Sequence, residues 1–181
     1  MDKRIFRWNA AGFLWTVTAG TALHFLFDYT GGALWAGAVS AVNESVWEHM
    51  KLLFLPVFLF TLVQSAALDT KIPSLAAVRT VSALAGTAFI PVVYYTYTGA
   101  VGRRFLWADV TIFLAAAALT FALDRQLRRR GRLTAPWQQL VGFAVLWAAA
   151  FLFVWCTYRP PNLPLWQDPL TGTYGVTGGF S

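Results

Sequence analysis

Long apolar runs alternate with short polar segments along this chain of 181 residues. A helix needs roughly 20 apolar residues to cross the hydrocarbon core of a bilayer. Five runs meet or approach that length, at residues 8–27, 46–68, 78–97, 105–123 and 136–158. The pattern predicts an all-α, polytopic transmembrane bundle of about five spanning helices, forming a single domain over residues 1–175.

Two further segments do not fit the spanning pattern. Residues 33–42 are apolar but too short to cross, so we expect an interfacial or re-entrant segment packed against the bundle. The tail at 159–175 is rich in Pro and Gly, yet it keeps large apolar side chains that disordered segments rarely carry. We expect an ordered, extended tail folded over the outer end of the bundle, followed by a mobile terminus at 176–181.

Composition supports a membrane protein. Apolar residues make up 57% of the chain and charged residues 12%, and the mean hydropathy is +0.55. Soluble domains carry about 25% charged residues. The net charge of +6 does not indicate a nucleic-acid partner, because the basic residues lie at the ends of apolar runs. The single cysteine, Cys156, excludes an intramolecular disulfide and a CxxC site. The expected partner is the lipid bilayer, and the oligomeric state is left open.

The distribution of Lys and Arg predicts the orientation in a plasma membrane. With the N-terminus in the cytoplasm, most basic residues fall on the cytoplasmic side, namely Lys3, Arg4, Arg7, Lys71, Arg79, Arg125, Arg128, Arg129, Arg130 and Arg132. Arg103 and Arg104 are discordant. We therefore predict a cytoplasmic N-terminus and an extracytoplasmic C-terminus. Both histidines and most carboxylates then lie on the extracytoplasmic side.

The segment 43–51, Asn-Glu-Ser-Val-Trp-Glu-His-Met-Lys, concentrates polar chemistry directly before an apolar run. Ser45 and Glu48 have the spacing of a capping box, and Asn43 is an alternative helix cap. Capping explains Ser45 and Glu48 but not Glu44 or His49. We expect Glu44, Glu48 and His49 to be catalytic, because ionisable groups at a bilayer edge usually serve a function.

His24 and Asp28 are four residues apart near the end of the first run, so they share one helix face. We predict that His24, Asp28 and His49 bind a metal, with Glu44 or Glu48 as a further ligand and one position left for water. His, Asp and Glu together form the ligand set of divalent sites such as catalytic zinc. Alternatively, His24 bonds a neighbour while Asp28 caps the following turn. A proton relay or a cation site is equally compatible with these residues.

Four further residues are predicted to contact substrate. Tyr94 and Tyr97 end the third run, where tyrosines are also typical of an interfacial aromatic belt. Asp109 begins the fourth run, as an inward carboxylate or as a first-turn residue. Asp168 lies in an expected turn at 168–172 of the tail.

Three motifs carry a resemblance to a known family: residues 41–53, the stretch Tyr94-Tyr95-Thr96-Tyr97-Thr98-Gly99, and the Pro- and Gly-rich pattern over 160–175. Together they resemble an uncharacterised family of small prokaryotic membrane proteins, a domain of unknown function, over essentially the whole chain. The resemblance implies a multi-helix membrane domain and brings no assigned activity.

Residues 43–49 are also similar to the Asn-Glu-Thr-x-Asn-Ile-Trp-Ser-His signature of the adiponectin-receptor and haemolysin III superfamily. That similarity implies a zinc site near one membrane face, and some members of the superfamily are lipid amidases. This chain departs from the pattern, with about five spans instead of seven and no late His-x-x-x-His.

These observations favour a metal-dependent hydrolase that acts on a lipid or amphiphile from the extracytoplasmic side. One alternative is a transport or solute-binding component that uses the same pocket. The cytoplasmic half offers few polar groups for a path, with Gln64, Ser65, Thr80 and Ser82 as candidates. The other alternative is a structural partner subunit.

Overall fold

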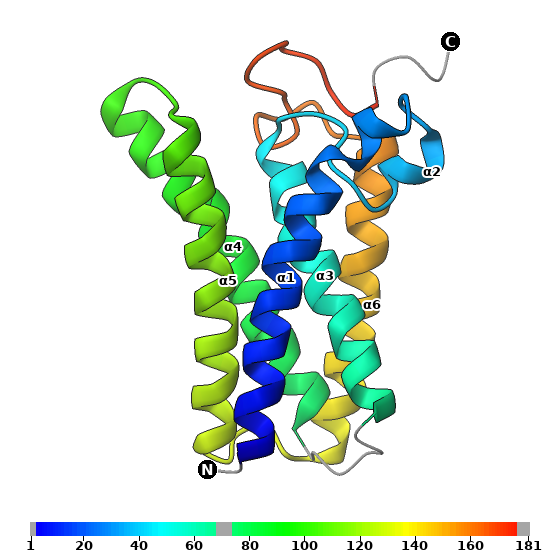
Figure 1. The fold of residues 1–181 in the computed structure, drawn as a ribbon, viewed down its shortest axis with the longest axis vertical. Coiled ribbons are helices and arrows are strands. Elements are labelled where there is room, and N and C mark those ends of the chain that lie inside the picture. Colours follow the sequence, from blue (N-terminus) through cyan, green and yellow to red (C-terminus); the bar gives the residue numbers. More distant parts are fainter. Residues whose placement is uncertain (1–2, 68–73, 177–181) are drawn as a thin grey trace.

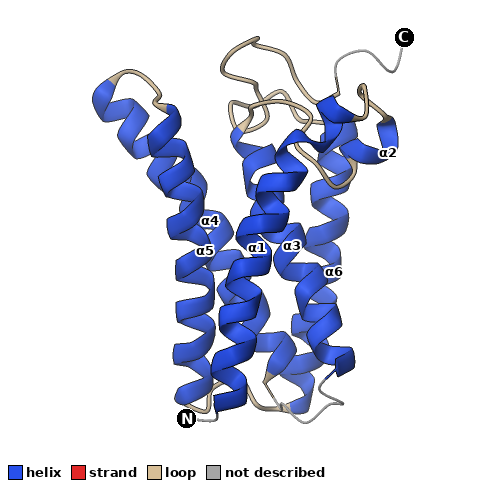
Figure 2. Cartoon of the chain, viewed as in Figure 1, coloured by secondary structure: helices blue, strands red, loops and turns tan. Residues whose placement is uncertain are grey.

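The computed structural model describes residues 3–67 and 74–176 as an all-helical bundle (Figure 2). Its helices are α1 (Lys3–Tyr29), α2 (Leu34–Gly37), α3 (Val46–Ala67), α4 (Leu75–Val101), α5 (Leu106–Arg129) and α6 (Pro136–Tyr158). No strand occurs in these two stretches, which confirms the predicted fold class. Leu68, Asp69 and Lys71, and the predicted mobile terminus from residue 177 onward, lie outside the described residues.

Five of the six helices are long and apolar enough to cross a membrane, which fits a multi-pass membrane protein. Several extend beyond the predicted apolar runs. For example, α5 continues to Arg129, because Gln, Leu and Arg are good helix formers even where the sequence is no longer apolar. The four-residue α2 lies inside the segment predicted to be too short to span.

The most buried helix, α3, contacts α1, α4, α5 and α6 (Figure 1). At one end of the bundle, α2, the start of α3 and the C-terminal tail gather around the last turns of α1 and α6. We call this the site end, and the opposite end the N-terminal end. The hairpin of α4 and α5 leans away from α1 at the site end.

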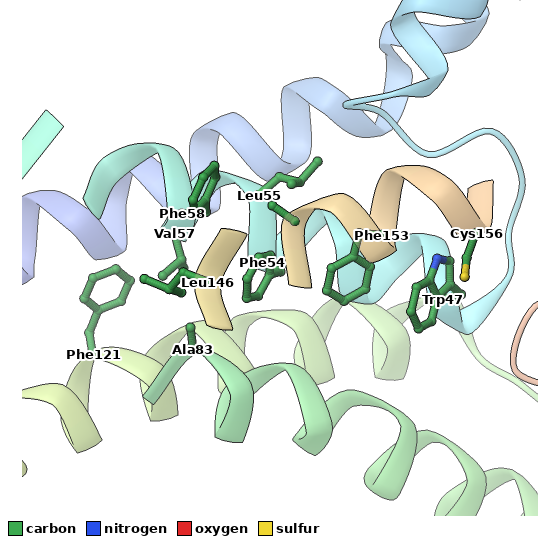
Figure 3. Close-up of a cluster of buried hydrophobic side chains, with 11 residues drawn as sticks. Trp47, Phe54, Leu55, Val57, Phe58, Ala83, Phe121, Leu146, Phe153 and Cys156 are labelled. Atoms are coloured by element: carbon green, nitrogen blue, oxygen red, sulfur yellow. The ribbon is translucent and has the colours of Figure 1, made fainter. Parts of the chain in front are cut away.

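An apolar core runs along the bundle axis (Figure 3). Trp47 on α3 packs against Phe153 on α6, with ring centroids 4.5 Å apart. The core continues through Phe54 and Leu146 to Phe121 on α5. Cys156 is buried in the same cluster, in keeping with a packing role.

Pro56 does not end α3, which continues as one helix to Ala67. Proline lacks an N–H, so the carbonyl of Leu52 loses its usual helical donor. Gly20 of α1 lies against that carbonyl: a Cβ atom there would come within 2.8 Å of the Leu52 oxygen. The missing side chain lets α1 approach α3 closely where the helical hydrogen-bond ladder is interrupted.

The tail is ordered and folds against the start of α3. The N–H of Trp47 donates to the carbonyl of Leu165 at 3.0 Å, which satisfies a first-turn amide that has no partner within its own helix. The indole of Trp166 packs on Trp47, with ring centroids 4.8 Å apart. Asn43 donates from its side chain to the carbonyl of Gly175 at 3.1 Å. These contacts fix the segment that precedes α3.

Candidate functional site

The start of α3 is held by both capping residues that the sequence offered. Ser45 Oγ accepts the N–H of Glu48 at 3.4 Å, and the N–H of Ser45 donates to Asn43 Oδ1 at 2.9 Å. In a complete capping box, the carboxylate of Glu48 would accept the N–H of Ser45. Here Asn43 accepts that N–H instead. The carboxylate of Glu48 is left to make other contacts.

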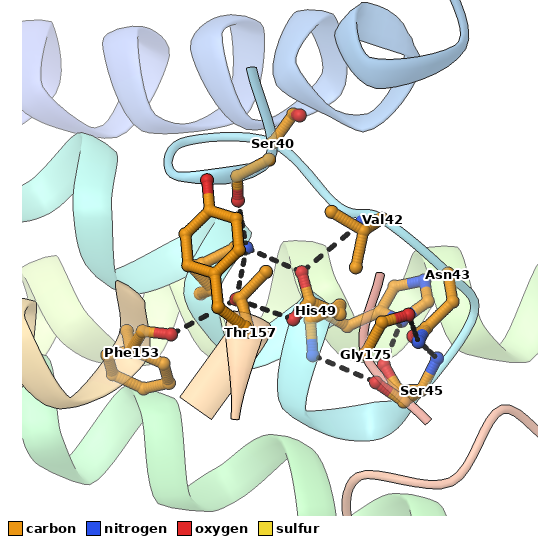
Figure 4. A network of polar contacts seen from close by, with 12 residues as sticks. Ser40, Val42, Asn43, Ser45, His49, Phe153, Thr157 and Gly175 are labelled. Carbon is orange, nitrogen blue, oxygen red and sulfur yellow. Dashed lines mark hydrogen bonds and ion pairs between the residues drawn. The ribbon is translucent and has the colours of Figure 1, made fainter. Parts of the chain in front are cut away.

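Glu48 lies in a buried polar network between α3 and α6 (Figure 4). Its Oε2 is 2.6 Å from Lys51 Nζ, and its Oε1 accepts the hydroxyl of Thr157 at 2.8 Å. Lys51 also donates to Thr157 at 2.7 Å and to the carbonyl of Gly37 at 2.9 Å. Every charge in this network has a partner of opposite charge. Its geometry assigns Glu48 to positioning the start of α3.

A second cluster at the site end joins His24, Glu44 and His49, from α1, the loop before α3, and α3. One ligand atom from each lies within 4.8 Å of the others. His24 Nε2 is 3.7 Å from Glu44 Oε1, and His49 Nε2 is 3.9 Å from Glu44 Oε2. The two imidazole rings meet edge to face at 5.4 Å. Three side chains of metal-binding type thus converge, each partly buried.

The ring of His49 is oriented by the backbone. Its Nδ1 lies 2.9 Å from the carbonyl of Ser45. A carbonyl only accepts, so Nδ1 is the donor of this hydrogen bond, and in the neutral ring Nε2 carries the lone pair on the side of Glu44. Histidines that bind metals commonly donate their other ring nitrogen to such a carbonyl, which fixes the tautomer. The local geometry therefore prepares His49 to bind a metal through Nε2.

Arg104, in the loop between α4 and α5, links this cluster to a second carboxylate. Its Nη2 donates to Glu44 Oε2 at 3.2 Å, and its Nε lies 3.4 Å from Asp109 Oδ2. Asp109 also accepts the hydroxyl of Tyr97 at 2.5 Å. Burial opposes the charge of Arg104, but the hydrogen bond to Glu44 and the charges of Asp109 and Glu44 outweigh it. The pKa of Arg104 is therefore raised above its ordinary value.

A small cavity of about 30 Å³ lies beside the cluster, with room for about two water molecules. Its lining combines apolar side chains with ionisable and hydroxyl groups. The lining residues are Glu44, Val46, His49, Ile90, Tyr94, Arg104, Asp109, Ile112 and Phe113. The cavity therefore brings together five polar side chains from α3, α4, α5 and their loops.

The structure separates three predicted site residues from this cavity. Asp28 is exposed and is not part of the histidine cluster. Helical spacing places it one turn from His24, but Glu44, distant in sequence, is the carboxylate that meets the imidazole. Asp168 is buried in the tail, where its Oδ1 accepts the N–H of Leu170 at 2.7 Å. Glu48 lies in the network with Lys51.

A further ionic cluster, at the N-terminal end, had no counterpart in the sequence-based interpretation. Arg79 and Asp124 are fully buried, with Arg79 Nε 3.4 Å from Asp124 Oδ1. Arg128 binds the same carboxylate through Nε at 2.8 Å and Nη2 at 2.9 Å. Arg79 also donates to Gln64 Oε1 at 2.9 Å. Asp124 is followed directly by Arg125 and, four residues after Asp124, by the run of arginines at 128–130, so it looks like ordinary flanking charge, and only helix packing reveals its burial.

Comparison with known proteins places the chain in a family. Residues 2–176 match the Family of unknown function (DUF6512). The protein belongs to this family. No curated protein and no solved structure matches it. The match confirms the resemblance to an uncharacterised membrane family, whereas the similarity of residues 43–49 to the adiponectin-receptor superfamily receives no support from these comparisons.

Proposed function

We propose that this protein is a membrane-embedded, metal-dependent hydrolase that acts on a lipid or amphiphile from the extracytoplasmic side. The observation that carries the proposal is the convergence of His24, Glu44 and His49 within 4.8 Å. Two imidazoles and one carboxylate are a ligand set of catalytic zinc and leave a fourth position for water. A bound zinc ion supplies activation of that water as a nucleophile.

The charge balance of the site supports a cation. Glu44 and Asp109 are accompanied by one guanidinium, that of Arg104, which leaves one net negative charge while the histidines are neutral. Isolated charge is costly at a partly buried site near hydrocarbon. A divalent cation would offset this charge, so the electrostatics of the site favour its occupancy.

The cavity supports an amphiphilic substrate. Its walls are divided between apolar and polar side chains. Its volume of about 30 Å³ is too small for an acyl chain, so the chain of a lipid substrate would remain in the bilayer. Leu106, Trp107 and Val110, on the first turns of α5, are exposed and suited to contact with lipid. Tyr94 lines the cavity and would contact the bound group.

The orientation remains as the basic residues predict. Arg125, Arg128, Arg129, Arg130 and Arg132 lie at the N-terminal end of the bundle, opposite the histidines. An excess of Arg on the cytoplasmic side supports an extracytoplasmic site end. Cysteine-accessibility labelling in intact cells tests this: Arg103→Cys should react with an impermeant reagent from outside, and Arg130→Cys should not.

Metal analysis of the purified protein tests the proposed site. We expect about one zinc ion per chain after reconstitution and dialysis, and its loss in His24→Ala and His49→Ala. Asp28→Ala is the matched control, because it removes a nearby carboxylate that is outside the cluster. Equal zinc content in wild type and both histidine variants would overturn the metal site. Zinc binding without hydrolysis of any ester or amide lipid in a defined panel would overturn the hydrolase assignment.

A transport component is the second candidate. The specific observation that favours it is the buried cluster of Arg79, Asp124 and Arg128, which places polar groups in the half of the bundle where the sequence indicated few. Two arginines around one carboxylate oppose the passage of a cation. Proteoliposome flux of small anions tests this candidate, and absence of flux above empty vesicles would exclude it.

A further inference from the structure

Arg104 and the proposed metal compete for the same carboxylate. Glu44 Oε2 accepts from Arg104 Nη2 at 3.2 Å and faces His49 Nε2 at 3.9 Å. A divalent ion bound between the histidines would take electron density from that oxygen. The hydrogen bond to Arg104 would weaken as a result, because both positive groups draw on one negative charge.

The remainder of the guanidinium is held in place and partly unused. Nε stays beside Asp109 at 3.4 Å, and the Tyr97 hydroxyl fixes that carboxylate from its other oxygen. Nη1 is shielded from solvent and has no hydrogen-bond partner among the described residues. Arg104 also lines the cavity. Within the described part of the chain, the guanidinium therefore has one nitrogen without a hydrogen-bond partner, Nη1, and a second, Nη2, that metal binding would release from Glu44.

We propose that Arg104 is a metal-gated receptor for an anionic group of the substrate, such as a phosphate or carboxylate head group. In the metal-free protein, Glu44 occupies Nη2 and the receptor is closed. Metal binding to His24, Glu44 and His49 opens it, and two nitrogens of one planar guanidinium then bind two oxygens of the anion. This inference rests on the proposed metal site and assigns the substrate class as an anionic amphiphile.

Two consequences distinguish a gated receptor from a simple ion pair. The first is reciprocity: if metal tightens anion binding, the anion tightens metal binding by the same factor. The second is that weakening the carboxylate should open the receptor without any metal. Glu44→Gln removes the negative charge and keeps the size of the side chain. A purely structural arginine predicts weaker or unchanged anion binding in this variant.

Calorimetric titration of inorganic phosphate into the full-length protein in neutral detergent, with EDTA and at fixed ionic strength, tests the gate. We expect Glu44→Gln to bind phosphate at least about fivefold more tightly than wild type, the lower limit of typical coupling. Glu44→Gln/Arg104→Gln should lose this gain. Glu44→Gln/Arg104→Lys serves if the first double variant does not fold, because Lys lacks the planar fork.

Arg103→Gln is the matched control. Arg103 is the neighbouring arginine of the same loop, but it is exposed and stacks over the ring of Phe105 at 4.7 Å, outside the cavity lining. We expect wild-type phosphate binding in this variant. Unchanged or weaker phosphate binding in Glu44→Gln would overturn the inference. So would a loss of phosphate binding in Arg103→Gln as large as the loss caused by replacing Arg104. Either result would leave zinc binding, and with it the proposed function, intact.

The source of the anion is tested by comparing inorganic phosphate with dihexanoyl phosphatidic acid below its micellar concentration. An amphiphilic substrate predicts tighter binding of the lipid in Glu44→Gln, because its acyl chains can contact the exposed apolar side chains at the start of α5. Equal affinities would overturn the amphiphile assignment and identify a free anion. If zinc fails to bind the wild type at all, the proposed function falls, whatever the phosphate titrations give.

Discussion

The ammonium of Lys51 lies 2.6 Å from the carboxylate of Glu48, and both side chains are buried in the bundle. Through Thr157 and the carbonyl of Gly37, this pair ties the first turn of α3 to α6 and to α2. His49 lies between the two charged residues in sequence. The pair therefore helps to fix the first turn of α3, which carries His49 to the cluster with His24 and Glu44.

Replacing Lys51 by Met should leave Glu48 charged and unpaired in the interior. Loss of one partner of a buried ion pair costs about 3–5 kcal/mol in free energy of unfolding. Glu48→Gln/Lys51→Met should recover most of this loss, because the uncompensated charge is gone. Denaturant unfolding in detergent should be measured for the wild type, the two single variants and the double variant, which together form a double-mutant cycle. Additive losses in the double variant would contradict a direct charge pairing.

Asp124 should be equally sensitive at the other end of the bundle. Asp124→Asn leaves Arg79 and Arg128 without their shared carboxylate, so we expect a loss of about 3–5 kcal/mol in free energy of unfolding. Arg129→Gln, at an exposed position on the same helix, should change stability by less than about 0.5 kcal/mol. Zinc content of folded Asp124→Asn should match wild type. A selective loss of zinc would mean that the two ends are coupled.

Gly86 should tolerate no side chain. A Cβ atom at this position of α4 would lie 1.9 Å from Thr120 Oγ1 and 2.8 Å from the carbonyl of Ala116 on α5. Gly86→Ala must push the two helices apart, at a cost of about 1–3 kcal/mol. Gly99→Ala is the control on the same helix, since nothing lies within 4 Å of its Cβ position. Thermal unfolding of both variants should show a lower Tm only for Gly86→Ala.

Metal binding should weaken as the pH falls. A proton and a metal ion compete for the same imidazole lone pair, so a higher proton concentration favours the metal-free state of a site with histidine ligands. Equilibrium dialysis against a fixed free zinc concentration should give lower occupancy at pH 5 than at pH 7.5. Occupancy that is independent of pH in this range would argue against histidine ligands.

The sequence was sufficient to predict the helices, because spanning length and apolar runs are local properties. The start of α3 was also partly predictable: Ser45 and Asn43 both hold it, although Glu48 completes a different set of contacts. A carboxylate can cap its own helix or pair with a neighbouring lysine, and the choice depends on burial by α6.

Partners across helices were not predictable from spacing. The four-residue interval selected Asp28 as the companion of His24, whereas Glu44 fills that place from a loop distant in sequence. The role of Arg104 was likewise hidden, because its charge is discordant with the topology bias and its two carboxylates come from separate elements. Such contacts depend on how the helices dock, which no local pattern specifies.

The hydrogen bond from Trp47 to Leu165 sets an order of assembly. The tail follows every helix in order of synthesis, so the first turn of α3 waits for its last partner while α4, α5 and α6 are made and inserted. The spanning helices can therefore reach the membrane before the histidine cluster has its final surroundings. The residues of the proposed metal site are brought into place at the close of folding, after the bundle that carries them.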